Sequence, residues 1–295
     1  MLDHKYHIFY RLAQNPNTTQ IAEEMHLSQP AISKNIQEME KELGITLFHR
    51  EKGRLRLTDN GTYLYAELVP VIKKEREILF HLGQMRDNFK GTIHIGASTT
   101  LSQYILPEIL ARFTNRYPDI NINFISGNTR QIEQDILNDS LHLAFIEGTP
   151  SQTTIRYIPY LQDEIVLVCA EKSKIPETLT QEQLSDYPFI FREKGSGTYD
   201  VIKKQLEKAG TSISQLNVQL ILGTTEGIKQ YLYNSNALAF LSVYSIRHEL
   251  AARRLRIIDI DGLTITRTLY AIHRQGEPDP YARLFLDFTL NHLPR

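Results

Sequence analysis

The stretch from residue 17 to residue 38, NTTQIAEEMHLSQPAISKNIQE, decides the N-terminal part of the fold. Asn17 stands three residues before Gln20, which is typical of a helix start. After a break at residues 26–27, Ser28 can cap a second helix that has Pro30 in its first turn. The apolar stripe of this second helix is Ile32, Ile36 and Met39. Two short helices joined by a tight turn, about 20 residues in all, predict a helix-turn-helix.

The exposed face of the second predicted helix favours contact with DNA. Its short side chains can donate and accept hydrogen bonds at base edges and phosphates: Gln29, Ser33, Lys34 and Gln37. The alternative is the solvated face of an ordinary helical pair. Residues 47–58 favour the interpretation as a DNA-binding motif. After Gly53 apolar and basic residues alternate, with Leu55 and Leu57 inward, which predicts a β-hairpin wing. The basic residues of this wing, which would attract phosphate, are Arg50, Lys52, Arg54 and Arg56.

A long helix is predicted from Thr58, as its cap, to about Asp87. About 30 residues of helix span roughly 45 Å. Its apolar residues alternate in steps of four and three, which is a heptad seam interrupted by Glu75 and complicated by Pro70. Packing on its own chain is the alternative, but so narrow a seam favours dimerisation through Leu64, Leu68, Val71, Ile78 and Leu82.

From Gly91 onward, short apolar runs alternate with helical stretches. This rhythm predicts an α/β fold with mainly parallel sheets covered by helices. The predicted strands are 92–97, 120–125, 143–146, 165–170, 189–191, 218–222, 237–241, 256–260 and 268–273.

Small polar side chains stand where several of these strands end. A helix over residues 101–117 is expected to follow the first strand, and free N–H groups at its start would favour an anion. Plain helix capping is the alternative. Hydroxyl and backbone donors, rather than a lysine or arginine, are expected to hold the ligand. The candidate effector-binding residues are Ser98, Thr99, Thr100, Ser126, Asn128, Thr129, Glu147, Ser196, Thr198 and Thr224.

The N-terminal motifs resemble the LysR-type transcriptional regulators. The resemblance is carried by residues 27–33 (LSQPAIS), then by Ile36, Glu40, Leu43, Gly44, Leu47, Phe48, Arg50 and residues 57–61 (LTDNG). It implies that Gln29 contacts a base and that Ser33, Lys34 and a wing arginine contact phosphate, with Ser28 and Pro30 in the same DNA-binding set. Lys34 stands where the family usually has arginine, which removes a planar two-pronged donor.

The same resemblance runs to the C-terminus and implies the domain organisation. A winged helix-turn-helix occupies 1–57, as an all-α head in an otherwise α/β chain, and a linker and dimerisation helix occupies 58–90. The effector domain is expected to resemble periplasmic solute-binding proteins, with subdomain I at 91–163 and 266–295 and subdomain II at 164–265. The implied function is sequence-specific transcription regulation by a homodimer or homotetramer, controlled by a small anionic metabolite bound between the subdomains. The similarity is greatest to the subgroup that controls sulfur or carbon assimilation, although Tyr199 stands where that subgroup tends to carry arginine.

Composition narrows the remaining classes of function. The formal net charge is −1, so the basic surface for double-stranded DNA must be local. One cysteine, Cys169, rules out an internal disulfide and a cysteine-rich zinc site. We expect a cytoplasmic protein with no membrane partner, because no secretory signal or bilayer-length apolar run is present. The scattered histidines show no metal-ligand spacing, so we expect no metal, and we expect no cofactor. A solute-binding protein and an enzyme are the rival classes, and the familiar catalytic motifs of an enzyme are missing.

Overall fold

A computed structural model describes residues 1–51, 54–86 and 88–293. The chain divides into two compact units. The first consists mainly of residues 1–91, and the second contains most of the remainder.

The first unit contains a three-helix head, a hairpin and a long helix. The head helices are α1 (His4–Gln14), α2 (Thr18–Glu24) and α3 (Gln29–Leu43). Strands β1 (Phe48–Glu51) and β2 (Arg54–Leu57) pair antiparallel and form the predicted wing. Helix α4 (Asp59–Met85) follows and continues through Pro70. The expected caps are present, since the side chains of Asn17, Ser28 and Thr58 each accept a hydrogen bond from a backbone N–H in the helix they precede.

Hydrogen bonds between side chains and the backbone fix the connection between α3 and the wing. The Glu40 carboxylate accepts hydrogen bonds from the N–H groups of Leu47 and Phe48, at 2.6 and 3.2 Å. Thr58 donates its hydroxyl to the Thr46 carbonyl at 2.7 Å. A Cβ at position 61 would stand 2.1 Å from the Leu47 carbonyl oxygen, so only glycine fits there. These residues of the family motif therefore hold the wing rather than face a partner.

The second unit is built on one mixed sheet of ten strands. The hydrogen-bonded order is β4-β3-β5-β12-β6-β10-β8-β9, with β11 paired to β6 and β7. The strands are β3 (Gly91–Ser98), β4 (Ile120–Gly127), β5 (Leu143–Glu147), β6 (Ile155–Ala170), β7 (Thr178–Leu179), β8 (Pro188–Phe191), β9 (Asn217–Ile221), β10 (Leu238–Ser242), β11 (Leu255–Ile260) and β12 (Ile265–Arg274). The sheet is mixed rather than mainly parallel: β3 pairs parallel with β5, and β8 with β9 and β10, whereas β12 runs antiparallel to β5 and β6, and β6 antiparallel to β10 and β11.

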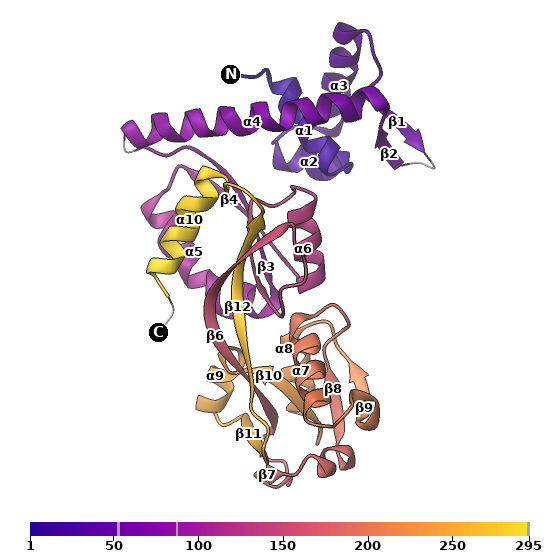
Figure 1. The fold of residues 1–295 in the computed structure, drawn as a ribbon, viewed down its shortest axis with the longest axis vertical. Coiled ribbons are helices and arrows are strands. Elements are labelled where there is room, and N and C mark those ends of the chain that lie inside the picture. Colours follow the sequence, from indigo (N-terminus) through magenta and orange to yellow (C-terminus); the bar gives the residue numbers. More distant parts are fainter. Residues whose placement is uncertain (52–53, 87, 294–295) are drawn as a thin grey trace. The chain divides into compact units, whose positions relative to one another are not determined.

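Strands β6 and β12 join two lobes of this unit (Figure 1). We call β3 to β5, with π-helix η1 (Leu101–Ile105), α5 (Leu106–Arg116), α6 (Thr129–Leu137) and α10 (Pro280–Asn291), lobe I. Lobe II contains β7 to β11 with the 3₁₀ helices at Glu182–Asp186 and Ile213–Gln215, and α7 (Gly197–Lys208), α8 (Thr225–Leu232) and α9 (Val243–Ala251). Apolar side chains of β6, β8, β10 and α7 make the largest buried cluster of lobe II.

Two local expectations differ from the structure at the junction of the lobes. Strand β6 begins at Ile155, ten residues before the predicted strand. Its first half was not predicted, because it alternates between buried and exposed residues instead of forming an apolar run. The helix after Thr100 opens with a π-helical turn, and no side chain caps it. Single π-helical turns are often found at functional sites.

Within the described part of the chain, no helix is both long and apolar enough to cross a lipid bilayer.

Candidate DNA interface and effector site

Helix α3 presents the predicted DNA-reading residues at its N-terminal end. Gln29 is exposed, and its amide nitrogen donates to the Thr18 hydroxyl of α2 at 2.9 Å. Ser33 and Lys34 are also exposed, and Lys34 forms a long ion pair with Glu38, at 3.8 Å. Ser28 accepts a hydrogen bond from the Ala31 N–H, so its hydroxyl serves as a helix cap. The surface therefore combines one oriented amide with short polar and basic side chains.

The wing carries part of the expected basic surface. Arg50 is exposed on β1, and Arg56 on β2 forms an ion pair with Glu51 at 2.8 Å. Lys52 and the side chain of Arg54 lie outside the described part of the structure. Arg56 thus shares its charge with Glu51, whereas Arg50 is exposed on β1.

The two halves of the long helix α4 have different surroundings. Leu68 is 5% exposed and packs in the core of the head, with Leu64 partly buried beside it. Glu75 also faces the head, where its carboxylate accepts from the Leu2 N–H at 2.9 Å and lies 3.0 Å from His7 Nε2. Toward the C-terminal end of α4 the exposed apolar side chains are Ile78, Leu79, Leu82 and Met85, and Val71 is exposed nearer the middle. The predicted seam thus divides: Leu64 and Leu68 stabilise the head, whereas Val71, Ile78 and Leu82 remain available to a partner.

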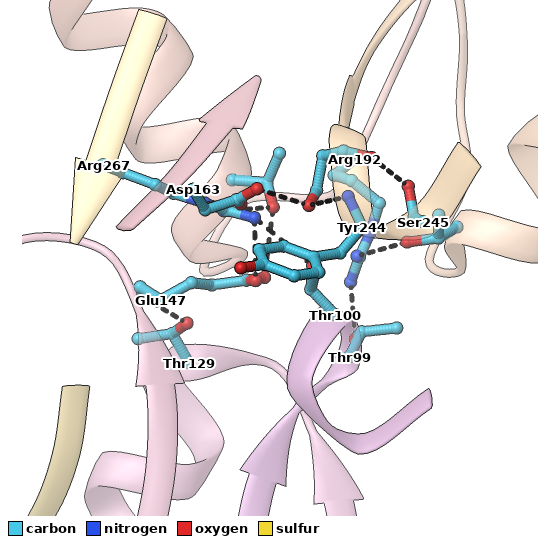
Figure 2. A network of polar contacts seen from close by, with 12 residues as sticks. Thr99, Thr100, Thr129, Glu147, Asp163, Arg192, Tyr244, Ser245 and Arg267 are labelled. Atoms are coloured by element: carbon cyan, nitrogen blue, oxygen red, sulfur yellow. Dashed lines mark hydrogen bonds and ion pairs between the residues drawn. The ribbon is translucent and has the colours of Figure 1, made fainter. Parts of the chain in front are cut away.

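In the second unit, a buried ionic cluster lies where β6 and β12 pass between the lobes (Figure 2). Arg267 on β12 stands opposite Asp163 on β6, and its Nε lies 2.7 Å from that carboxylate. The same guanidinium lies 3.2 Å from Glu147 Oε2 at the end of β5. It also donates to Thr198 of lobe II at 2.9 Å and to Thr100 of lobe I at 3.4 Å. Residues of both lobes are therefore tied to one crossing strand.

A second arginine makes a direct contact between the lobes. Arg192 follows β8, is 3% exposed, and donates to the Thr99 hydroxyl of lobe I at 3.1 Å. It also donates to Thr225 of α8 at 3.4 Å. Glu193 accepts two hydrogen bonds from the same guanidinium, at 2.9 and 3.0 Å. Adjacent residues of lobe I, Thr99 and Thr100, thus contact two different arginines.

The ionisation of this region follows from burial and from the arginines. Burial raises the pKa of Asp163 above its ordinary value, although Arg267 and the Ser242 hydroxyl oppose the shift. Partial burial also disfavours ionised Glu193, but the hydrogen bonds and charge of Arg192 outweigh it and hold the Glu193 pKa below its ordinary value. Glu193 is therefore the more firmly ionised of these two carboxylates.

The remaining candidate effector residues take up different positions. Ser98 and Ser196 are fully buried, and no group among the described residues hydrogen-bonds to either hydroxyl. Thr129 donates to the Glu147 carbonyl at 2.9 Å, and the Asn128 amide lies 3.4 Å from Glu193. Ser126 bonds to Ser102 at 2.7 Å. Thr224 is an exposed cap of α8 whose hydroxyl accepts from the Gly227 N–H, and the buried network instead contains its neighbour Thr225.

Sequence reasoning missed the charged residues of this site. Ligand binding through hydroxyls and backbone groups, without an arginine, was expected, and the structure adds two buried arginines, Arg192 and Arg267, to the polar network around these hydroxyls. Asp163 was missed with them. The alternation of residues 155–164 contained a signal, because a buried aspartate on a crossing strand needs a cationic partner on its neighbour. Over the described residues, no group of three or more histidine, cysteine, aspartate or glutamate side chains could hold a metal ion.

Comparisons with known proteins agree with this architecture. Residues 4–62 match the model for bacterial regulatory helix-turn-helix proteins of the lysR family, and residues 86–294 match the LysR substrate binding domain. The chain is 32% identical to the HTH-type transcriptional regulator YeiE of Escherichia coli K12, over 95% of this chain and 94% of that protein.

Solved structures show the same fold. The regulatory domain of CcmR from Synechocystis PCC6803 is 26% identical, with a TM-score of 0.63, covering 68% of this chain and 97% of that one. Full-length OxyR from Pseudomonas aeruginosa, at 17% identity and a TM-score of 0.71, covers 99% of this chain and 95% of its own. The winged head and the two-lobed α/β unit define a DNA-binding regulator with an effector-binding domain. The chain belongs to the LysR family and is a LysR-type transcriptional regulator.

Proposed function

We propose that a small anionic metabolite controls DNA binding by this regulator from a site between lobes I and II. The observation that carries the proposal is the pair of buried arginines, since Arg192 contacts Thr99 and Arg267 contacts both Thr100 and Thr198 across the lobes. A buried guanidinium with planar donors is well suited to a carboxylate or other oxyanion. The unpartnered hydroxyls of Ser98 and Ser196 add two donors beside these threonines. The regulatory domain of CcmR, a structural relative, has been solved in complex with 2-PG.

The energetic case is sufficient for a metabolite. Hydrogen bonds to a charged ligand contribute about 1.5–3 kcal/mol each, so several of them reach micromolar affinity at about −8 kcal/mol. A ligand that binds one arrangement of the lobes more tightly shifts the population toward it. Linker helices that join two copies of the chain would transmit this shift to the spacing of two DNA-reading heads.

The same proposal assigns DNA contacts and an oligomer. Gln29 reads base edges in the major groove, with Ser33, Lys34 and Arg50 on phosphates, and Lys52, Arg54 and Arg56 complete the basic wing. The exposed face of α4 holds a homodimer, from which a homotetramer is built.

Thr100→Val tests the effector site, because it keeps the side-chain shape and deletes the hydroxyl that meets Arg267. Full-length protein is screened by thermal shift against oxyanions and carboxylates, and the best ligand is then measured by calorimetry. We expect the variant to bind this ligand at least tenfold more weakly while binding DNA normally. Thr268→Val is the matched control. Thr268 lies beside Arg267 on β12, but its hydroxyl accepts an exposed hydrogen bond from Gln162, at 3.2 Å. Unchanged affinity in Thr100→Val would place the ligand elsewhere.

A further inference from the structure

The junction of the lobes carries an excess of negative charge. Three carboxylates, Asp163, Glu147 and Glu193, accompany only two guanidinium groups, Arg192 and Arg267. Arg192 and Glu193 neutralise each other, with N–O distances of 2.9 and 3.0 Å. Arg267 is shared between two carboxylates, at 2.7 Å from Asp163 and 3.2 Å from Glu147. One negative charge on the Arg267 side therefore has no cation of its own in this cluster.

Solvent cannot offset this charge. Glu147 is 1% exposed, Asp163 4% and Arg267 5%. An uncompensated buried carboxylate is strongly destabilising, so a proton accompanies it in the free protein, in line with the raised pKa of Asp163, and a cationic group of a ligand can replace that proton.

Glu147 is the carboxylate that remains incompletely satisfied. Its Oε1 accepts from the Thr198 hydroxyl at 3.1 Å, and its backbone carbonyl accepts from Thr129. Its Oε2 takes part in the ion pair with Arg267, but no donor within the described ranges makes a hydrogen bond to it. Two further buried groups without a partner, the hydroxyls of Ser98 and Ser196, belong to the segments that supply Thr99, Thr100 and Thr198. Unsatisfied buried polar atoms thus belong to Glu147 and to the two segments, one from each lobe, that contact Arg267.

Glu193 differs from the other two carboxylates, because its side chain is 28% exposed. It can turn into solvent and release Arg192 to the carboxylate of a ligand, whereas Glu147 and Asp163 are confined. The charge balance then depends on the ligand. A simple monoanion in place of Glu193 leaves one excess negative charge at the junction, and a dianion leaves two. A ligand that carries one anionic and one cationic group makes the junction neutral.

We propose that the effector is amphoteric, with a carboxylate on Arg192 and Thr99 and a protonated amine on Glu147, so that an α-amino acid is its simplest class. This inference rests on the proposed function, because it concerns the same site. Thr99 and Thr100 are adjacent and contact the two arginines separately, and Arg267 also contacts Glu147, so the two halves of the site meet at neighbouring residues of one segment. An α-amino acid carries both of its charged groups on one carbon and is therefore the simplest ligand that can serve both halves. An ammonium group would give Glu147 Oε2 the hydrogen bond that it lacks.

The test compares ligands that differ only in the amine. Full-length protein is titrated calorimetrically with L-amino acids and with the 2-hydroxy acids of the same skeleton, such as alanine against lactate and aspartate against malate. We expect at least one amino acid to bind, with its hydroxy acid at least tenfold weaker. A hydroxy acid that binds as tightly as its amino acid, or inorganic phosphate or sulfate that binds where no amino acid does, would overturn the inference.

Two variants locate the effect. Glu147→Gln keeps the size of the side chain and removes its charge, so we expect the preference for the amine to fall at least tenfold. Glu193→Gln is the matched control and should strengthen amino-acid binding, because it weakens the competitor for Arg192. An unchanged preference in Glu147→Gln overturns the inference, and should that variant not fold, the comparison of ligands on the unmodified chain decides alone.

Failure of this inference can be distinguished from failure of the proposed site. If a hydroxy acid or an inorganic anion binds best and Thr100→Val abolishes its binding, the anion site stands and the amphoteric ligand is wrong. If the best ligand is unaffected by Thr100→Val, the site between the lobes is wrong as well. Absence of binding by every probe counts against both.

Discussion

Individual polar residues of this protein divide into those that hold the backbone and those that are available to a partner. The hydroxyls of Ser28 and Thr58 accept hydrogen bonds from backbone N–H groups at helix starts. The side-chain amide of Gln29 donates a hydrogen bond to the Thr18 hydroxyl, which restricts the conformation of this side chain in the free protein. Such preorganisation lowers the entropic cost of a specific contact.

Gln29→Ala should therefore relax the choice of base more than it weakens overall binding. One lost bidentate base contact costs about 1–3 kcal/mol of discrimination at that position. Selection of bound fragments from a random DNA pool, followed by sequencing, measures the change. Retention of the original site preference would remove Gln29 from the base-reading residues.

Arg50→Ala provides the contrasting control. A phosphate contact carries no sequence information, so affinity should fall about equally for all DNA. The slope of log affinity against log salt should become shallower by about one unit. An unaltered slope would mean that Arg50 does not touch phosphate.

At the scale of elements, the two halves of α4 have different surroundings. Its first half continues the core of the head through Leu68 and Ile72, and its second half exposes Ile78 and Leu82, each 50% accessible. A heptad pattern alone does not separate the two halves, because both carry the same apolar stripe.

Paired variants of α4 distinguish dimerisation from folding. Ile78→Glu with Leu82→Glu should produce a smaller species in sedimentation, because like charges would face each other across the proposed seam. Leu68→Ala should leave the mass unchanged and lower the free energy of unfolding by about 2–5 kcal/mol, as expected for a buried leucine. Wild-type mass in the double variant would assign the oligomer to other surfaces.

At the scale of the whole effector-binding unit, the two crossing strands couple the lobes, and one of them carries a buried histidine. His273 on β12 is 6% exposed, and its Nδ1 lies 2.7 Å from the Arg274 carbonyl oxygen. Burial lowers the pKa of His273 below 6.5, its ordinary value. The unfolded chain therefore takes up a proton on this residue at a higher pH than the folded chain does.

His273 should contribute to acid destabilisation. Its stabilising effect is complete above about pH 6.5 and declines as the pH falls toward the lowered pKa. Melting temperatures measured between pH 7.5 and 5 should fall less in His273→Gln than in the wild type. An equal fall in both proteins would show that other groups govern the acid response.

Much of the local architecture was predictable because it depends on neighbouring residues. The capping residues Asn17, Ser28 and Thr58 and the helical spacing of Ile32, Ile36 and Met39 gave the helix-turn-helix and the start of α4. Alternation of Leu55 and Leu57 gave the wing. Most strands of the second unit were recognised as apolar runs, whereas the first half of β6, which alternates, was not.

Other features were decided only by tertiary structure. Arg267 and Thr100 are 167 residues apart in the chain, and Arg192 and Thr99 are 93 apart. No local pattern relates such residues, since their meeting depends on the register of β6 with β12 and on the packing of one lobe against the other.

The sequence by itself determined the DNA-reading head, the wing, the long helix and the segments of Ser98–Thr100 and Ser196–Thr198. Their signals are capping and periodicity, which act over one or two turns of the chain. The tertiary structure decided that Leu68 belongs to the head, that Thr225 rather than Thr224 joins the network, and that Glu147 shares an arginine with Asp163. Burial and long-range pairing set these outcomes, because the cost of an unpaired buried charge depends on every element packed around it.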